Sequence, residues 1–281
     1  MTGTGTTLVV GATGTTGGRT AAQLIAAGHR VQAGSRRAVP LPGAEAVSFD
    51  WYDTDTHDAA LDGADRVYLV PPPGEWNPAA VMLPFLRRAR DAGVRRAVLL
   101  SSSAVPEGGP AVGAVHRALP GLFEQWAVLR PSWFMQNFTG AHAHAVSIRE
   151  EGAIFTAAGS GRVGFVDADD IAAVAVRALT DDHAPGTDLV LTGPEALGYD
   201  DIAAILTRAG GRTVVHRRLT NEQLRARLAT LVPPDFAAML ADMDRAIAGG
   251  AEDRTTDTVQ RVTGRPPHGF REVLERELRA R

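Results

Sequence analysis

The chain opens with a strand, a glycine-rich turn and a helix in direct succession. Residues 6–11 read TTLVVG, a short β-branched and apolar run, and residues 17–27 read GGRTAAQLIAA, a helix-forming stretch that ends before Gly28. The turn over residues 11–18 reads GATGTTGG. Glycine permits a tight turn there and lets backbone N–H groups approach a pyrophosphate, while the helix N-terminus adds partial positive charge. The arrangement predicts a dinucleotide-binding unit, with a glycine-rich packing turn as the alternative.

Short apolar strands and helical stretches continue to alternate along the first part of the chain. Helical stretches are predicted at 56–61 and 77–92, and strands at 29–34, 44–49, 66–70, 95–100 and 125–129. This alternation is typical of a parallel, doubly wound sheet with right-handed crossovers. We therefore predict an α/β, Rossmann-like fold, with the dinucleotide-binding core over residues 1–131.

The pattern changes after residue 131, where helices predominate. Helices are predicted at 132–150, 169–179, 199–208, 221–230, 234–248 and 269–279, with short strands near 163–165, 188–191 and 213–217. This order predicts a mixed region over residues 132–281 that contains a smaller, helix-rich substrate-binding lobe. We expect parts of residues 160–192 to return to the first domain.

Charge and hydropathy make several classes of partner unfavourable. The 281 residues carry a net charge of −3, which provides no field to hold a polyanion. No apolar run approaches the ~18 residues of a transmembrane helix, and no cationic leader precedes the first strand. We expect a cytoplasmic protein with a small-molecule substrate and without nucleic-acid or membrane partners. A homodimer is the base-rate expectation for its assembly.

Two missing residue types exclude whole classes of chemistry. The sequence has no cysteine and no lysine, so its 29 basic residues are all arginine. Thiolate nucleophiles, Schiff bases and lysine-tuned tyrosines are therefore excluded. His142 and His144 are two residues apart, which places them on different faces of a helix, and we predict no metal site.

Two arginines follow the second predicted strand, roughly 20 residues beyond the glycine-rich turn, where NAD-selective sites usually carry an acidic residue. Arginine at this place pairs with a 2′-phosphate instead. Arg36 and Arg37, with Ser35, therefore favour NADP(H), and two solvated loop arginines are the alternative. Further nucleotide contacts are expected from Thr13, Thr15, Asp50, Trp51, Val70, Pro71, Pro72 and Ser101, although Asp50 is equally well read as a turn cap.

Several motifs, taken in their order along the chain, resemble those of a known family. GATGTTGG, the arginine after the second strand, LVPPP, LLSSSAV and LRPSWFMQNF are followed by GRVGFVDADDIAAVA, LTGPEALGYDDIAAIL and RVTGRPP. Together they resemble the atypical short-chain dehydrogenase/reductases with NmrA-like, NAD(P)H-binding members, nearest the quinone oxidoreductase type 2 and agroclavine-dehydrogenase-like group. The resemblance covers nearly the whole chain. It implies a phosphate-binding turn formed by Gly11, Thr13, Gly14, Thr16 and Gly17, with Arg36 at the 2′-phosphate.

The resemblance also implies a catalytic position at Ser103, but the chain departs from the family's full catalytic set. In extended relatives a tyrosine, and a lysine four residues later, complete the site. Here no tyrosine occurs between residues 101 and 150, and with His116 at the lysine position the tyrosine position falls at Val112. Ser103 and His116 are therefore the candidate catalytic residues. His116 is the best remaining proton donor, with a hydrogen-bonded helix histidine as the alternative.

Aromatic residues gather after the strand predicted at 125–129, where ligands bind in open α/β sheets. The substrate-binding candidates are Trp76, Ser102, Trp133, Phe134, Asn137 and Phe138. The aromatic residues at 133–138 are expected to form a flat apolar wall, and Trp76 is expected to close the pocket. Core packing is the alternative for part of this set. Ser102 and Ser103 are expected to bind an acceptor oxygen, with ordinary capping after a strand as the alternative. Phe236 and Met239 in a late helix are expected to help close the pocket.

The missing tyrosine narrows the range of acceptors. Reduction of an ordinary ketone needs a positioned acid, worth typically about 10²–10⁴-fold in rate. A quinone delocalises the charge that hydride brings, and an iminium ion is neutralised by it. We therefore expect an NADPH-dependent reductase of an activated, aromatic small molecule. The alternatives are a non-enzymatic NADP(H) sensor of the NmrA type and a redox-neutral isomerase or cyclase.

Overall fold

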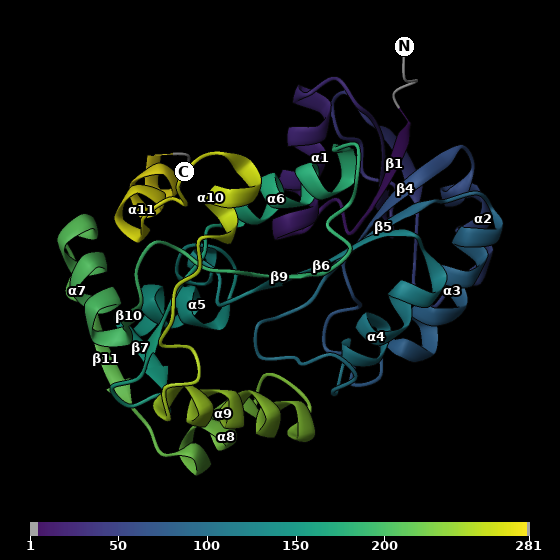
Figure 1. The fold of residues 1–281 in the computed structure, drawn as a ribbon. Helices are drawn as coiled ribbons and strands as arrows, with labels where there is room; N and C mark the ends of the chain where they lie inside the picture. Colours follow the sequence, from purple (N-terminus) through teal and green to yellow (C-terminus); the bar gives the residue numbers. More distant parts are fainter. Residues whose placement is uncertain (1–4, 280–281) are drawn as a thin grey trace. The chain divides into compact units, whose positions relative to one another are not determined.

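The computed structural model describes residues 5–279, which form two compact units (Figure 1). The first unit comprises Met1–Pro131 and Ala168–Val190, and the second comprises Ser132–Asp167 and Leu191–Arg281. Residues 1–4 and 280–281, at the ends of the two predicted domains, lie outside the described part of the chain.

A seven-stranded sheet forms the centre of the first unit. In spatial order its strands are β3 (Glu45–Ser48), β2 (Arg30–Ser35), β1 (Thr6–Val10), β4 (Ala64–Leu69), β5 (Arg96–Leu100), β6 (Gln125–Pro131) and β9 (Asp188–Leu191). Neighbouring strands run parallel, with Leu8 of β1 between Gln32 and Val67. The strand order reverses at β1, which confirms the predicted doubly wound fold. Ligands of such sheets bind beyond the carboxyl ends of the strands at this reversal.

Helices cover both faces of this sheet. They are α1 (Thr15–Ala26), α2 (His57–Leu61), α3 (Ala79–Asp91), α4 (Gly113–Leu122) and α6 (Ala168–Thr180), with a 3₁₀ turn, η1 (Thr54–Thr56). Helices α1 and α6 pack together on one face, and α3 and α4 pack together on the other (Figure 1). The core beside α3 contains Phe49, Trp51, Phe85 and Leu99. Burial of each such apolar side chain stabilises the fold by roughly 1.5–3 kcal/mol.

Arg96 at the start of β5 anchors the segment that returns to the first unit. Its guanidinium donates hydrogen bonds to the carbonyl oxygens of Leu179 (2.9 Å), Asp181 (2.6 Å) and Asp182 (3.2 Å). It also donates to Oε1 of Gln125 (3.1 Å). The last carbonyls of a helix have no partner within the helix, so a cation there satisfies them and complements the helix dipole. Arg96 thereby caps the C-terminal end of α6.

The second unit is mainly helical. Its elements are η2 (Met135–Phe138), α5 (Ala143–Glu151), β7 (Ala153–Thr156), β8 (Arg162–Val163), β10 (Leu197–Gly198), α7 (Tyr199–Gly210), β11 (Val215–Arg218), α8 (Asn221–Leu228), α9 (Pro234–Ala248), α10 (Thr258–Thr263) and α11 (Phe270–Arg279). Strands β7 and β11 pair in parallel, and β8 and β10 pair antiparallel. The core gathers around Phe138, Phe165, Tyr199 and Phe270. Within residues 5–279, none of the helices combines the length and hydropathy that a bilayer span requires.

The single helix predicted over residues 132–150 is wrong. The backbone is extended around Trp133, whose carbonyl accepts a hydrogen bond from the N–H of Val166 (3.0 Å), and Val166 in turn accepts from the N–H of Met135 (2.9 Å). Only η2 and α5 are helical in this stretch. Pairing with a segment about 30 residues later in the chain therefore takes the backbone groups that a helix would need, and local sequence does not show this.

Candidate functional site

The glycine-rich turn after β1 has a backbone that requires glycine. Gly11 has a φ of +75°, in the left-handed region, and its N–H donates to the carbonyl of Gly34 (3.0 Å). A Cβ atom on Gly17 would lie 2.2 Å from the carbonyl oxygen of Gly11. Gly14 is the N-cap of α1, so no capping side chain covers the first turn of the helix. This exposed, positively polarised helix end fits the pyrophosphate of a dinucleotide.

The threonines of the turn differ in exposure. Thr13 and Thr15 are exposed beside Gly14, whereas Thr16 is buried in the first turn of α1. Thr13 and Thr15 therefore present their hydroxyl groups where a phosphate would approach, and Thr16 packs beneath the turn.

Ser35 shapes the turn that carries the two predicted phosphate-binding arginines. Its Oγ accepts a hydrogen bond from the N–H of Val39 (3.1 Å), and its carbonyl accepts from the N–H of Ala38 (3.1 Å). Arg36 and Arg37 are exposed, and neither forms an ion pair or hydrogen bond with residues 5–279. Two free guanidinium groups on a fixed turn, next to the glycine-rich turn in the sheet, fit a 2′-phosphate.

Trp51 ties the ends of β3 and β4 together from within the core. Its side chain is only 7% exposed, and its indole Nε1–H donates to the carbonyl of Val70 (3.1 Å). Its ring packs edge-to-face on Phe85, with the centroids 5.2 Å apart. The Trp51 ring is therefore poorly placed to flank a bound adenine, because the side chain is buried and its N–H is bonded within the core.

The exposed ring at this turn belongs to Tyr52, which sequence reasoning did not single out. Asp50 supports it, since Asp50 Oδ1 accepts the N–H of Tyr52 (3.0 Å) as a turn cap does. Across from it, Val70 and Pro71 are half-buried and Pro72 is buried. Side chains alternate between the two faces of an extended chain, so a buried Trp51 would have identified Tyr52 as the exposed ring.

Arg130 of β6 holds the loop that follows β5. Its Nη2 donates to the carbonyl of Ser103 (2.9 Å), and its Nη1 forms an ion pair with Oδ2 of Asp188 (2.6 Å). The N–H of Ser103 donates to the carbonyl of Pro131 (2.9 Å), so β6 continues to pair with this loop. Sequence reasoning missed this role, because the partners of Arg130 are far apart in the chain.

The three serines of this loop are placed differently. Ser103 is buried and Ser102 is half-buried. The Oγ of Ser101 is buried and has no hydrogen-bond partner within residues 5–279. An unpaired hydroxyl at the carboxyl end of a strand is a fitting donor for a bound nucleotide.

His116 is buried in α4, and its Nδ1 has no partner within the described part of the chain. Burial lowers the pKa of His116; the carboxylates of Asp188 and Glu107 oppose this shift, and Arg130 adds to it. The imidazole is therefore mostly neutral at pH 7. A neutral imidazole is a far weaker acid than an imidazolium ion, which disfavours His116 as a strong proton donor.

The chain has three tyrosines, and none of them follows Ser103 at the position where the family's catalytic tyrosine would stand. Tyr68 is fully buried in β4, where burial raises its pKa to about 12. Tyr199 is buried in the core of the second unit, and burial likewise raises its pKa. Tyr52 lies on the turn after β3, away from the loop that contains Ser103.

The aromatic residues predicted to form a substrate wall divide between surface and core. Trp133, Phe134 and Asn137 are half-buried in the second unit. Phe138 is buried, and its ring stacks on His144 with the centroids 5.5 Å apart. Phe138 therefore belongs to the core, as the packing alternative had it, while the other three retain exposed surface. Trp76, in the first unit, is 56% exposed.

Asp244 of α9 is a buried carboxyl group with one hydrogen bond among the described residues. Its Oδ2 accepts the N–H of Ala157 (2.8 Å). Burial raises the pKa of Asp244 to about 6 from 3.8, against the opposing effect of this hydrogen bond. Folded protein thus binds the Asp244 proton more tightly than unfolded chain does, so rising pH destabilises the fold between these two values.

Asp244→Asn is expected to be more stable than the unchanged protein above pH 6 and not at pH 4. The asparagine keeps an oxygen for the N–H of Ala157 and removes the buried charge, a difference of up to about 3 kcal/mol between the two pH values. Thermal melts of both proteins from pH 4 to pH 8 measure the gap. A gap in melting temperature that does not change with pH would contradict the buried ionisation.

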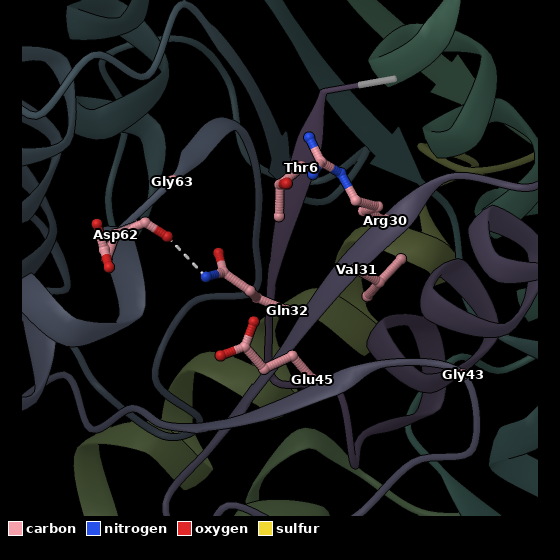
Figure 2. A pocket seen from close by; sticks show the side chains of 8 residues that line it. All are labelled: Thr6, Arg30, Val31, Gln32, Gly43, Glu45, Asp62 and Gly63. Carbon is pink, nitrogen blue, oxygen red and sulfur yellow. Dashed lines mark hydrogen bonds between the residues drawn. The ribbon is translucent and has the colours of Figure 1, made fainter. Parts of the chain in front are cut away.

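The first unit has a separate hollow of about 330 Å³, and Figure 2 labels the residues that line it. It is lined by Thr6, Arg30, Val31, Gln32, Gly43, Glu45, Asp62 and Gly63. Thr6, Arg30 and Glu45 are the first residues of their strands, so the hollow lies at the amino ends of β1, β2 and β3. The glycine-rich turn follows the carboxyl end of β1, and the hollow is therefore not part of the dinucleotide site.

The chain is similar to known NAD(P)H-binding proteins and oxidoreductases. Residues 11–123 match the protein family described as NAD(P)H-binding. The chain is 47% identical over 266 residues to the uncharacterized oxidoreductase YesF of Bacillus subtilis (strain 168), covering 94% of this chain and 92% of that protein. It is 40% identical over 278 residues to agroclavine dehydrogenase of Claviceps fusiformis, covering 96% of each.

The fold is also that of solved structures. The NADPH-dependent quinone oxidoreductase QOR2 of Escherichia coli, solved in complex with NADPH, has a TM-score of 0.79 to this chain at 23% identity. The similarity covers 97% of this chain and 99% of that one. The resemblance expected from the motifs is thus confirmed, and the chain belongs to the family of NAD(P)H-dependent oxidoreductases that includes agroclavine dehydrogenase.

Proposed function

We propose that this protein is an NADPH-dependent reductase that transfers hydride to a delocalised, electron-poor small molecule, such as a quinone or an iminium ion. Bound NADPH supplies the hydride from C4 of its nicotinamide ring and leaves as NADP⁺. Hydride and one proton from solvent convert a quinone to a hydroquinone. Hydride alone converts an iminium ion to a neutral amine. Neither acceptor needs a strong acid at the moment of transfer.

The observation that carries this proposal is the lack of a suitable acid. The chain has no lysine, Tyr68 and Tyr199 are buried, and burial lowers the pKa of His116. An alkoxide formed from an ordinary ketone would find no charged donor among these groups. The names of similar proteins support a reductase of such acceptors, since one relative is named agroclavine dehydrogenase and one structural neighbour is named a quinone oxidoreductase.

The residues of the protein would then contribute mainly position. Arg130, paired with Asp188, holds the loop of Ser101–Ser103 against β6. The loop is thereby fixed in position at the carboxyl ends of β5 and β6. Reactants that are held in a good orientation react faster, because binding has already removed their translational and rotational freedom. Ser102 and Ser103 are the groups proposed to hold an acceptor oxygen, with Trp76 of the same unit against the rings of the substrate. The substrate contacts expected of Trp133, Phe134 and Asn137 in the second unit stay a prediction.

The preference for NADPH over NADH is part of the same proposal. It is supported by Arg36 and Arg37, two exposed guanidinium groups without partners among residues 5–279. Gly11, Thr13, Gly14, Thr15 and Gly17 are proposed to hold the pyrophosphate, with Asp50 and Ser101 at the two ends of the nucleotide.

The test is acceptor-dependent oxidation of NADPH, followed at 340 nm, by the purified protein. The matched pair is 1,4-naphthoquinone and 1-tetralone, which share a bicyclic skeleton and differ in their need for an acid. A cyclic iminium ion and an enone complete the panel. We expect turnover with the quinone or the iminium ion and little with the ketone. Tight binding of NADPH without turnover on any acceptor would contradict a reductase and favour a nucleotide sensor.

A further inference from the structure

Large apolar side chains are exposed on the loops that follow three strands of the first unit, which are consecutive in the chain. Val39 follows β2, Tyr52 follows β3 and Trp76 follows β4. Tyr52 is 61% exposed, and its ring stacks on no other ring within residues 5–279. Trp51 beside it is only 7% exposed, so the chain buries one of two adjacent aromatic rings and leaves the other at the surface. An aromatic ring held out at the carboxyl edge of this sheet has a free face for a ligand.

The position of the Tyr52 ring is determined at both ends. At its backbone, the N–H of Tyr52 donates to Oδ1 of Asp50 (3.0 Å). At its tip, the phenol donates to Oε2 of Glu75 (2.7 Å), and Oε1 of Glu75 accepts the N–H of Asn77 (2.9 Å). The side chain thus spans from the turn after β3 to the loop after β4, and it is held there without being packed.

Two ties of different character join these same loops. The hydrogen bond from Trp51 to the carbonyl of Val70 is made by a buried side chain, so it is shielded from water and holds the two loops together. The bond from Tyr52 to Glu75 is exposed to solvent, where water competes with it, so it opens at little cost. The two loops are therefore joined by a buried hydrogen bond from Trp51 and by an exposed hydrogen bond from Tyr52 that can open and close.

The turn of Tyr52 starts beside the turn of the phosphate-binding arginines. Ser35 and Ser48 are partners in the register of β2 and β3, and the N–H of Phe49 donates to the carbonyl of Ser35 (3.0 Å). In NADPH the adenine is attached to the ribose carbon next to the one that carries the 2′-phosphate. A phosphate at Arg36 therefore brings the adenine to the neighbouring turn, which is that of Tyr52.

We propose that Tyr52 is a nucleotide-binding residue whose ring covers the adenine and whose hydrogen bond to Glu75 ties the loop after β4 over the bound nucleotide. This rests on the proposed function, because it takes the dinucleotide to be NADPH with its 2′-phosphate at Arg36. Adenine is flat, and stacking on an aromatic ring is tolerant of small changes in position. The carboxylate of Glu75 lies at the tip of the ring, where it also accepts hydrogen bonds from an exocyclic amine.

The test separates the two halves of the nucleotide. Adenosine 2′,5′-bisphosphate and reduced nicotinamide mononucleotide are titrated by calorimetry into the full-length protein. Tyr52→Ala is expected to bind the bisphosphate and NADPH about 10-fold more weakly, as loss of one stacked base predicts, and the mononucleotide unchanged. Tyr52→Phe keeps the ring and removes the hydrogen bond to Glu75. It is expected to retain most of the equilibrium affinity and to release NADPH several-fold faster in stopped-flow measurements.

Leu231→Ala is the matched control, since Leu231 is an equally exposed apolar residue (66%) in the second unit. Its affinities should equal those of the unchanged protein. If Tyr52→Ala binds the bisphosphate normally while Arg36→Ala weakens it, the role of Tyr52 is overturned and the proposed function stands. If the unchanged protein binds neither the bisphosphate nor NADPH, the proposed function is overturned as well.

Discussion

Gly17→Ala is expected to weaken NADPH binding by about 100-fold or more, a loss of about 3 kcal/mol. The added Cβ atom would lie 2.2 Å from the carbonyl oxygen of Gly11 and 2.7 Å from its carbonyl carbon. Both are backbone atoms, so the clash cannot be relieved by turning a side chain. The turn must open, and its N–H groups then no longer converge where the pyrophosphate would bind.

Calorimetric titration of NADPH, together with a thermal melt, measures this effect. Gly121→Ala in α4 is the matched control, because a Cβ there meets nothing within 4 Å and alanine favours a helix. We expect it to bind NADPH normally and to melt at the same or a slightly higher temperature. A folded Gly17→Ala protein with normal NADPH affinity would show that this turn does not hold the nucleotide.

Arg36→Ala is expected to weaken NADPH binding by about 10–100-fold, because a charge-assisted hydrogen bond to phosphate contributes roughly 1.5–3 kcal/mol. NADH lacks the 2′-phosphate, so its affinity should hardly change. The preference of the protein for NADPH should therefore shrink by the same factor. Dissociation constants for both nucleotides at one salt concentration measure it, since salt screens such contacts.

Arg245→Ala serves as the control for net charge. Arg245 is an exposed arginine of α9 in the second unit whose guanidinium pairs with Asp242, so its removal changes the charge of the protein equally without touching the arginine turn. It should leave both affinities within about two-fold, as expected when only weak long-range steering changes. Equal losses of NADPH and NADH affinity in Arg36→Ala would refute contact with the 2′-phosphate.

The fold was predictable because its signals are local. The run TTLVVG, the turn at residues 11–18 and the helix after it form one strand–turn–helix unit, and each part follows from neighbouring residues. Repetition of apolar strands with intervening helices then leaves few topologies other than a parallel sheet. The helix predicted over residues 132–150 failed for the opposite reason, since its backbone pairs with Val166.

The candidate site was predictable in part. The glycine turn and Arg36 are recognisable because their chemistry depends on residue type at a short spacing. Trp51 was assigned to the nucleotide and lies in the core, whereas Tyr52 beside it is exposed. Residue type does not distinguish these two rings, because the choice depends on which side chain faces Phe85 and Val70 once the sheet has formed.

The classes of chemistry open to this protein are narrowed by its composition and its local patterns. It has no lysine or cysteine for catalysis, its strand–glycine turn–helix unit is of the kind that binds phosphate, and its arginines after the second strand favour a 2′-phosphate. Tertiary structure alone decided the environment of each group. The lowered pKa of His116, the hydrogen bond from Arg130 to Ser103 and the hydrogen bond from Tyr52 to Glu75 depend on burial or on contacts across the chain. Solvation and hydrogen bonding are set by neighbours in space, and a linear sequence does not list these neighbours.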